Sequence, residues 1–201
     1  MARQSSSTRQ HQIIEAAQNL ITSKGMEFLT IDAIAEQVGF TEGAIYKHFR
    51  SKRAILTLLI DSIEQNLMDT LINSKQLGDS CLDHLARILE NHLNDVEDRR
   101  AVSFMIISEA IAFNGIGMAD RVSVMLNNYL EFIKNVLDEG IREGSVRPDV
   151  DTRAASNSFL GMIQIVATLW TLDAYPKTFG GLRANMWDIY KKGVVREEAP
   201  S

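Results

Sequence analysis

The sequence predicts an all-α protein of about nine helices, with a small three-helix domain at the N-terminus and a larger helical bundle behind it. Three observations support this fold class. Only three prolines occur in 201 residues, so most of the chain is free of helix breakers. Apolar residues recur at intervals of three and four, the spacing of one helical face, and glycine or proline separates the segments that show this pattern.

The composition is that of a soluble, folded protein, with 45% hydrophobic and 23% charged residues. The single cysteine, Cys81, excludes an intramolecular disulfide framework and fits a reducing compartment, so we expect a cytoplasmic protein. Residues 1–12 are polar and lack the apolar core of a secretory signal. The uncharged stretch 154–172 is long enough for a membrane span, but its six serine, asparagine, glutamine and threonine residues favour a buried interface helix and no membrane partner.

Charge is divided unevenly along the chain. Residues 1–53 hold seven basic and five acidic side chains, a balance of +2, whereas the remainder holds 14 basic and 21 acidic ones, a balance of -7. A basic module joined to an acidic one suits a protein that touches phosphate groups with one end only. The basic residues could also be clustered by chance. Their positions within a motif must therefore decide whether they indicate contact with phosphate groups.

Three short apolar patterns follow one another at the N-terminus. A first helix is expected from about residue 7 to 24, where Gly25 ends it. Thr30 can cap a short second helix that ends at Gly39, and a third helix starts at Thr41. The expected inward faces are Ile13, Ile14, Ala17, Leu20 and Ile21 on the first helix, Ile31, Ile34, Ala35 and Val38 on the second, and Ile45 and Phe49 on the third.

A longer fourth helix is expected from about residue 52 to 73, with Ser51 as its cap. This helix connects two predicted domains, 1–53 and 54–201. Further helices are expected near 81–96, 100–113, 119–143, 152–174 and 182–194, because glycine and proline mark the breaks between them.

The segment from residue 30 to 52 has the spacing of a helix-turn-helix. Ala35 must be small because two helices cross closely there, Gly39 can adopt the left-handed conformation of a tight turn, and Ile45 fills the space between the helices. Glycine and alanine at 43 and 44 let the third helix approach DNA closely. The face left outward carries Thr41, Glu42, Gly43, Ala44, Lys47 and His48, with Tyr46 at its flank.

These residues resemble the signature of the tetracycline-repressor (TetR) family of bacterial regulators. The matching positions are Thr30, Ile34, Ala35, Gly39, Thr41, Gly43, Ile45, Tyr46, His48, Phe49, Ser51 and Lys52. The resemblance covers about the first quarter of the chain specifically and the remaining helical pattern only loosely. It implies a DNA-binding transcription regulator and no enzyme.

The resemblance also implies roles for single residues. Thr30, Thr41, Tyr46, His48 and Lys52 fall where the family contacts DNA phosphates, and Glu42, Ala44 and Lys47 fall where base edges are read. Each has a structural alternative: Tyr46 as a half-buried core aromatic, His48 as a cation that stabilises a helix end, and Lys52 as a solvated charge. Further upstream, Arg3 and Arg9 form either an arm for the minor groove or a disordered polar tail.

A single helix-turn-helix makes few contacts, so such proteins usually pair two recognition helices about 34 to 36 Å apart on a palindromic operator in double-stranded DNA. We therefore expect a homodimer. The helices near 152–172 and 182–194 are the interface candidates, and the family pairs its last two long helices in the same way. The expected interface residues are Ala155, Phe159, Met162, Ile163, Val166, Trp170, Leu182, Met186, Ile189 and Tyr190, with burial inside each subunit as the alternative.

Flexible and aromatic side chains gather in the middle of the chain and could line an apolar cavity. The candidates are Phe104, Met105, Phe113, Met125, Tyr129 and Phe132. Ordinary core packing explains them equally well. The resemblance favours a pocket for a small hydrophobic effector, such as a fatty acyl compound or a drug-like molecule, whose binding releases a repressor from its operator.

Two other classes of function are the alternatives. A helical-bundle enzyme finds little support, because Cys81 and His84 supply only two ligands on one helical face and are more simply a buried cysteine and a surface histidine. No metal and no cofactor are therefore expected. A DNA-binding protein of the same architecture that answers to a protein partner is the second alternative.

Overall fold

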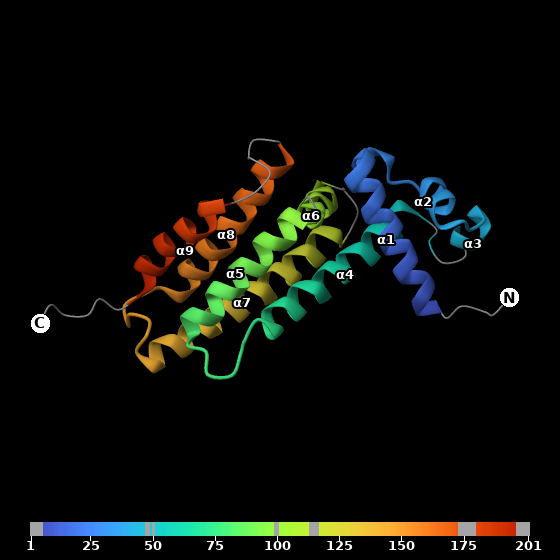
Figure 1. The fold of residues 1–201 in the computed structure, drawn as a ribbon. Helices are drawn as coiled ribbons and strands as arrows, with labels where there is room; N and C mark the ends of the chain where they lie inside the picture. The colour runs from blue at the N-terminus through green and yellow to red at the C-terminus, as the bar shows by residue number, and fades with distance from the viewer. Residues whose placement is uncertain are drawn as a thin grey trace, which may run out of the picture. The chain divides into compact units, whose positions relative to one another are not determined.

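The computed structural model describes residues 6–46, 49, 51–98, 101–112, 117–172 and 180–195, and within them the fold is all-α, as predicted. The chain begins with α1 (Ser6–Lys24), a short 3₁₀ helix η1 (Met26–Phe28), α2 (Ile31–Val38), α3 (Glu42–Tyr46) and α4 (Lys52–Asn73). It continues with α5 (Cys81–Asp98), α6 (Val102–Ala112), α7 (Met118–Glu143), α8 (Thr152–Thr171) and α9 (Gly180–Val194) (Figure 1).

Helix ends follow the local chemistry of the backbone. The hydroxyl of Thr30 accepts from the N–H of Ala33 at 3.1 Å, and Asp151 accepts from two N–H groups of the first turn of α8. The sixth helix starts later than the predicted residue 100, because Ala101 has a φ of 55°, a left-handed conformation that an α-helix excludes. The helix predicted for 152–174 ends at Thr171, and residues 173 and 174 lie outside the described ranges.

The structure divides into two compact units. Unit 1 comprises residues 1–65 and 102–122, and unit 2 comprises residues 66–101 and 123–201. The boundary between the two units falls inside α4 and inside α7. The domain boundary predicted at residue 53 remains a prediction.

Unit 1 is a small helical core around α1. Helix α2 packs on α1 and α3, and α6 packs on α1 and η1. Two ion pairs tie its more distant segments together: Lys52 with Glu109 at 2.8 Å, and Arg121 with Asp61. Its fully buried side chains include Ile13, Ala17, Ile21, Leu29, Ile34, Ile45, Ile55, Leu59 and Ile106.

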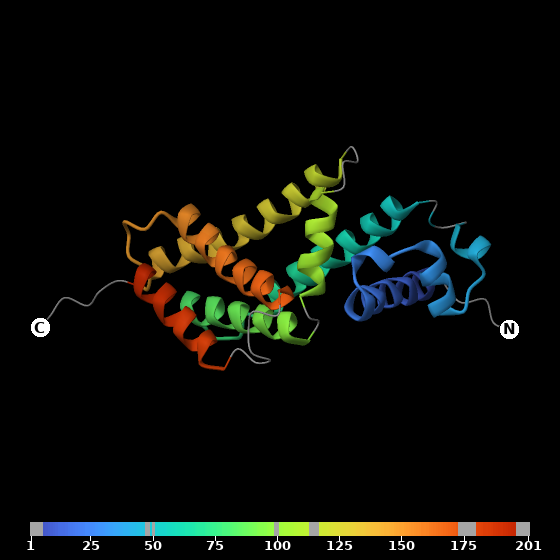
Figure 2. The ribbon, with the colours of Figure 1, turned by 90° about the horizontal axis from the view of Figure 1, so that it is seen from above.

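Unit 2 is a bundle in which α5 lies beside α8 and α9 (Figures 1 and 2). Helices α5 and α7 meet through ring contacts, His84 with Phe132 and His92 with Tyr129. Arg183 of α9 contacts Glu97 of α5 in a half-buried ion pair. Leu85, Ile88, Leu93, Ile133, Leu137, Phe159 and Val166 are among the side chains that fill the core.

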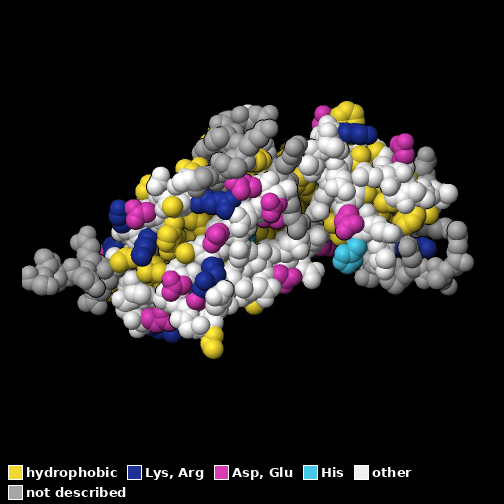
Figure 3. Space-filling view, viewed as in Figure 1, with side chains coloured by type: hydrophobic (Ala, Val, Ile, Leu, Met, Phe, Trp, Pro, Cys, Tyr) yellow, Lys and Arg dark blue, Asp and Glu magenta, His cyan; other side chains and the backbone are white. Residues whose placement is uncertain are grey.

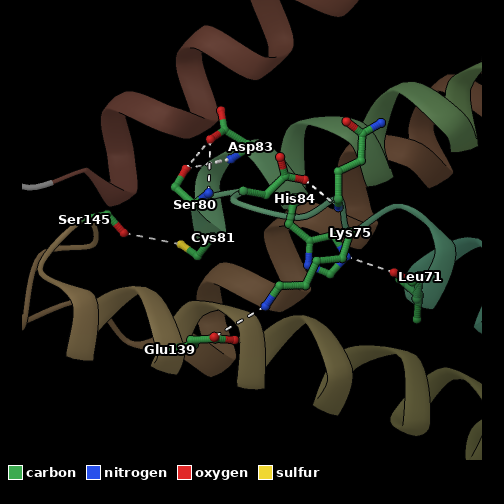
Figure 4. A network of polar contacts seen from close by, with 10 residues as sticks. Leu71, Lys75, Ser80, Cys81, Asp83, His84, Glu139 and Ser145 are labelled. Atoms are coloured by element: carbon green, nitrogen blue, oxygen red, sulfur yellow. Dashed lines mark hydrogen bonds and ion pairs between the residues drawn. The ribbon is translucent and has the colours of Figure 1, made fainter.

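A polar network holds the turn between α4 and α5 in unit 2 (Figure 4). Ser80 and Asp83 cap the start of α5 reciprocally, since the Ser80 N–H donates to Asp83 and the Asp83 N–H donates to the Ser80 hydroxyl, both at 3.2 Å. Lys75 and Glu139 form an ion pair at 3.4 Å. The network therefore fixes where α5 begins.

Side chains of α5 also bind backbone carbonyl groups at the end of α4 and directly after it. The His84 Nε2 lies 2.9 Å from the Leu71 carbonyl oxygen, and the Arg87 Nε donates to the Ser74 carbonyl at 3.2 Å. His84 is buried, so its prediction as a surface histidine was wrong: a ring nitrogen that satisfies a buried carbonyl is stable inside the core. Cys81 is buried as predicted, with its Sγ 3.6 Å from the Ser145 hydroxyl.

The described part of the chain shows neither a membrane-spanning helix nor a cluster of metal-binding side chains. None of its helices has both the length and the apolar character that crossing a lipid bilayer needs. Nor do its histidine, cysteine, aspartate and glutamate side chains gather anywhere in a set of three that could hold a metal ion.

Gly140 gives a test of the packing in unit 2. A Cβ at this position would contact Cys81 Sγ and lie 2.6 Å from Val146 Cγ2, closer than carbon atoms approach without a shift. Gly140→Ala is expected to lower the free energy of unfolding by about 1–3 kcal/mol, the usual cost of overpacking. Urea unfolding followed by far-ultraviolet circular dichroism measures this loss.

Gly193→Ala is the matched control, because a Cβ there meets open space on α9. Its stability should stay within about 0.5 kcal/mol of that of the unsubstituted protein, as surface substitutions usually do. Equal stability of the two variants would contradict the packing described for Gly140.

Candidate nucleic-acid interface

The first helix of the helix-turn-helix, α2, is capped by Thr30 and ends in a left-handed turn at Gly39. Gly39 has φ 70° and ψ 25°, a conformation that costs a residue with a Cβ about 1 kcal/mol or more. The Phe40 N–H donates to the Ala35 carbonyl at 3.0 Å and the Gly39 N–H to the Glu36 carbonyl at 3.4 Å, the paired bonds of a Schellman motif. This turn sets the direction in which the chain enters α3.

Small and apolar side chains fix the two helices against each other. Ala35 is buried on α2 beside Ile34, and Ile45 of α3 is fully buried. Phe49, just after α3, is also buried. The predicted core side of the motif is therefore the side that faces inward, and the opposite side of α3 is left to solvent.

The predicted contact residues that the structure describes lie on the exposed side. Thr30, Thr41 and Gly43 are exposed, Ala44 is half-buried, and Tyr46 exposes 45% of its surface. Tyr46 is thus no core aromatic. The side chain of Glu42 and all of Lys47 and His48 lie outside the described residues.

Lys52 stands at the first position of α4 and makes an ion pair with Glu109 of α6. Its Nζ lies 2.8 Å from the Glu109 Oε1, and both side chains keep about a third of their surface exposed, at 37% and 30%. Sequence reasoning missed this partner, because Glu109 is 57 residues further along the chain. A phosphate that binds Lys52 must compete with this carboxylate.

Arg9 lies within α1, and its guanidinium carbon sits 5.8 Å from the centre of the Phe40 ring. The prediction of a disordered tail was therefore wrong for Arg9, because it lies in a helix and contacts an aromatic ring, whereas its contact with a minor groove stays a prediction. Arg3 lies outside the described residues.

The comparisons with known proteins agree with this geometry. Residues 13–59 match the family model described as bacterial regulatory proteins, tetR family, and residues 49–182 match the model of the YsiA-like protein C-terminal region. The second match alone spans more than half of the chain. The chain belongs to the tetR family. It is a DNA-binding transcriptional regulator, and the regulators of this family are not enzymes.

Relatives of similar length match most of the regulator. The fatty acid metabolism regulator protein of Bacillus subtilis is 22% identical over 183 residues, which cover 91% of this chain and 94% of the relative. The nucleoid occlusion factor SlmA of Vibrio atlanticus is 28% identical over 166 residues, 82% of this chain and 84% of the relative.

Solved structures share the fold. A putative transcriptional regulator from Saccharomonospora viridis in complex with choline has a TM-score of 0.83 and 18% identity, covering 95% of this chain and all of that one. The regulator FadR from Bacillus subtilis in complex with stearoyl-CoA has a TM-score of 0.76 and 23% identity, covering 91% of this chain and 98% of that one.

The residues predicted for a dimer interface divide into two groups. Ala155, Phe159, Val166 and Tyr190 are buried within the subunit, and the Tyr190 hydroxyl donates to the Ala155 carbonyl at 3.2 Å. A side chain with almost no exposed surface in one subunit has no area left to bury against a second, so Phe159 and Val166, at 0% and 1% exposed, belong to the core of unit 2. Ile163 is also buried, at 9% exposed, whereas Met162, Trp170, Leu182 and Met186 are partly exposed and Ile189 is 72% exposed.

The residues predicted for an effector pocket lie in both units. Phe104 and Met105 belong to unit 1, whereas Met125, Tyr129 and Phe132 belong to unit 2, and Phe113 lies outside the described residues. Their common pocket stays a prediction. Hollows of about 390 Å³ between α7 and α8 and about 330 Å³ between α4 and α5 are lined mostly by polar side chains, and neither includes any of the six.

The ion pair of Lys52 gives a test of the interface. Lys52→Gln is expected to weaken binding to any double-stranded DNA by roughly 3- to 10-fold and to reduce the salt dependence by about one unit per subunit, because a phosphate contact is lost. Glu109→Gln is expected to strengthen binding by up to about fivefold, the worth of an exposed ion pair. Fluorescence anisotropy with labelled duplex DNA at several salt concentrations measures both.

Lys75→Gln makes the same charge change on a lysine of unit 2 and serves as the control. It should leave DNA affinity and its salt dependence unchanged. An effect of Lys75→Gln as large as that of Lys52→Gln would mean that only net charge matters, and would contradict the role of Lys52.

Proposed function

We propose that this regulator is a cytoplasmic homodimeric repressor, which binds a palindromic operator through α3 and leaves it when a mainly apolar molecule binds its C-terminal domain. The observation that carries the proposal is the formed helix-turn-helix of unit 1, whose left-handed turn at Gly39 leaves Thr41 and Gly43 exposed on one side. A short exposed helix with a glycine in its first turn fits closely into a major groove.

The chemistry of the exposed side supports contact with a DNA backbone. The Thr30 oxygen accepts from the Ala33 N–H, which leaves the hydroxyl proton of Thr30 able to donate to a phosphate. Tyr46 exposes a second hydroxyl on the flank of α3. We assign Glu42, Ala44 and Lys47 to base reading and His48 and Lys52 to phosphate contact.

The choice of an acyl compound as effector rests on relatives. One curated relative is named a fatty acid metabolism regulator, and a protein of the same fold was solved with stearoyl-CoA. The alternative is control by a protein partner. Several relatives carry the name nucleoid occlusion factor, which names no small molecule.

The dimer proposal rests on the apolar side chains that unit 2 leaves at its surface. Ile165 and Leu172 of the α8 region and Ile189 of α9 expose 52%, 68% and 72% of their surface. Hydrophobic side chains lie between charged ones over this part of unit 2 in Figure 3. Exposed apolar groups on two neighbouring helices are typical of a surface that a second subunit covers.

The operator and the effector are tested in one experiment. Footprinting on the DNA that flanks the regulator's own coding region should reveal a protected palindrome with half-sites about one helical turn apart. Stearoyl-CoA, added to this complex, should release the DNA, whereas free coenzyme A should not. A stable footprint that no acyl compound changes would favour the protein-partner alternative, and the absence of any footprint at low salt would refute the proposal.

The dimer is tested with two exposed apolar residues. Ile189→Asp is expected to weaken self-association at least tenfold without loss of subunit stability, because Ile189 makes few contacts within its own chain. Leu77→Asp replaces a fully exposed side chain in the turn between α4 and α5, so it is the control and should leave the dimer intact. Sedimentation equilibrium measures both. A monomeric unsubstituted protein at micromolar concentration, or equal effects of the two variants, would refute the assignment.

A further inference from the structure

Two polar rings meet inside the bundle of unit 2. His92 of α5 and Tyr129 of α7 have ring centres 5.5 Å apart at an angle of 49°. They are 6% and 2% exposed, so both rings belong to the core. The sequence prediction included Tyr129 among pocket residues and did not consider His92.

Both rings carry a buried polar atom without a partner. Among the described residues, neither the His92 Nε2 nor the Tyr129 hydroxyl has a hydrogen-bond partner. A buried polar group left unpaired usually costs about 1–3 kcal/mol, and native proteins rarely keep two such groups side by side. Unpaired atoms on two rings that pack together are therefore best explained by a polar group that binds beside the pair.

Tyr190 shows what a satisfied buried tyrosine looks like in the same unit. It is 7% exposed, and its hydroxyl donates to the Ala155 carbonyl at 3.2 Å. The fold thus supplies a partner for one tyrosine hydroxyl of the core and leaves the other open. This contrast also provides a matched control.

The buried neighbours of the pair along its own two helices are apolar, and Tyr190 is near enough to Tyr129 to add to the rise of its pKa. One helical turn away on α5 lie Ile88 and Val96, and one turn away on α7 lie Met125 and Ile133, all of them buried. Loss of hydration on burial lowers the pKa of His92 to about 4 and raises the pKa of Tyr129. At neutral pH the imidazole is therefore uncharged and the phenol keeps its proton.

Because His92 and Tyr129 are both uncharged, they favour a neutral polar group of a ligand over a charged one. The Tyr129 hydroxyl can donate to a carbonyl oxygen, and the imidazole can donate or accept according to its tautomer. A carboxylate placed there would be buried without an opposite charge on either ring, which costs far more than burial of a neutral carbonyl. The site therefore suits a neutral oxygen attached to an apolar chain.

We propose that His92 and Tyr129 form the polar recognition point of the effector site, and that they bind a neutral ester, thioester or hydroxyl oxygen of an otherwise apolar effector. This inference rests on the proposed function, which supplies the apolar effector. It adds the chemical class of the group that is recognised: a neutral acyl derivative binds, and the corresponding free fatty acid is excluded by its charge.

The test compares two tyrosine variants with two probes of equal chain length. Methyl laurate carries a neutral ester carbonyl and laurate a carboxylate, and binding is measured on the full-length protein by titration below the critical micelle concentration. The unsubstituted protein should bind methyl laurate at least about tenfold more tightly than laurate. Tyr129→Phe should weaken binding of methyl laurate by about 3- to 10-fold and leave that of laurate unchanged.

Stability without ligand gives an independent measurement. Tyr129→Phe should leave the midpoint of thermal unfolding unchanged or raise it, because the hydroxyl that it removes has no partner. Tyr190→Phe removes a bonded hydroxyl and should lower the midpoint by about 2–4 °C, while its affinity for methyl laurate stays that of the unsubstituted protein.

Three results would overturn the inference. They are no binding of methyl laurate to the unsubstituted protein, equal binding of methyl laurate by Tyr129→Phe, or a loss of thermal stability in Tyr129→Phe as large as that in Tyr190→Phe, which would indicate a bridging water. Operator binding measured on the same samples separates the two proposals: if it persists, only the recognition point has failed, and if it is missing, the regulator proposal has failed.

Discussion

The left-handed turn at Gly39 is the constraint on which the DNA-reading surface depends. Because Gly39 has a φ of 70°, the backbone changes direction after α2, and α3 packs against α2. The crossing is close because Ala35 is small, and it is held because Ile45 is fully buried. One backbone conformation and two side-chain volumes therefore determine which side of α3 faces solvent. Everything that the exposed side can recognise follows from this local geometry.

The ion pair between Lys52 and Glu109 extends this dependence beyond the helix-turn-helix. It joins the first residue of α4 to α6, which also packs on α1 and η1 within the same unit. The position of Lys52 is thus determined partly by a segment that lies in the C-terminal family match, residues 49–182. Lys52 lies in both family matches, residues 13–59 and 49–182, whereas Glu109 lies only in the second, so the contact that positions this lysine reaches beyond the N-terminal match.

Local sequence patterns predicted the fold well, because the relevant interactions are local. Thr30 and Gly39 act through bonds to residues within five positions, so their roles can be read from spacing alone. The start of α6 was predicted too early, because alanine as a residue type does not predict the left-handed conformation that Ala101 adopts. Helix boundaries set by tertiary packing escape pattern analysis.

The site was predicted less completely, because its remaining features depend on contacts distant in sequence. An apolar stripe on α8 predicts burial, but spacing does not tell whether the partner is the same chain or another, and so Phe159 was assigned to the wrong surface. His92 and Tyr129 meet from different helices, and their unpaired atoms become visible only when the neighbours of each ring are known.

The contacts at the end of α4 depend more on the residue types of α5 than on those of α4. His84 and Arg87 hold backbone carbonyls of Leu71 and Ser74, and every residue type supplies such a carbonyl. Replacement of the residue at 74 therefore leaves the Arg87 bond available, whereas replacement of Arg87 removes it. The bonds from His84 and Arg87 therefore depend on the side chains of α5 and on no particular side chain at 71 or 74, whereas the bond from the Asn91 side chain to the Ser74 hydroxyl, 2.8 Å long, needs a hydroxyl at that position.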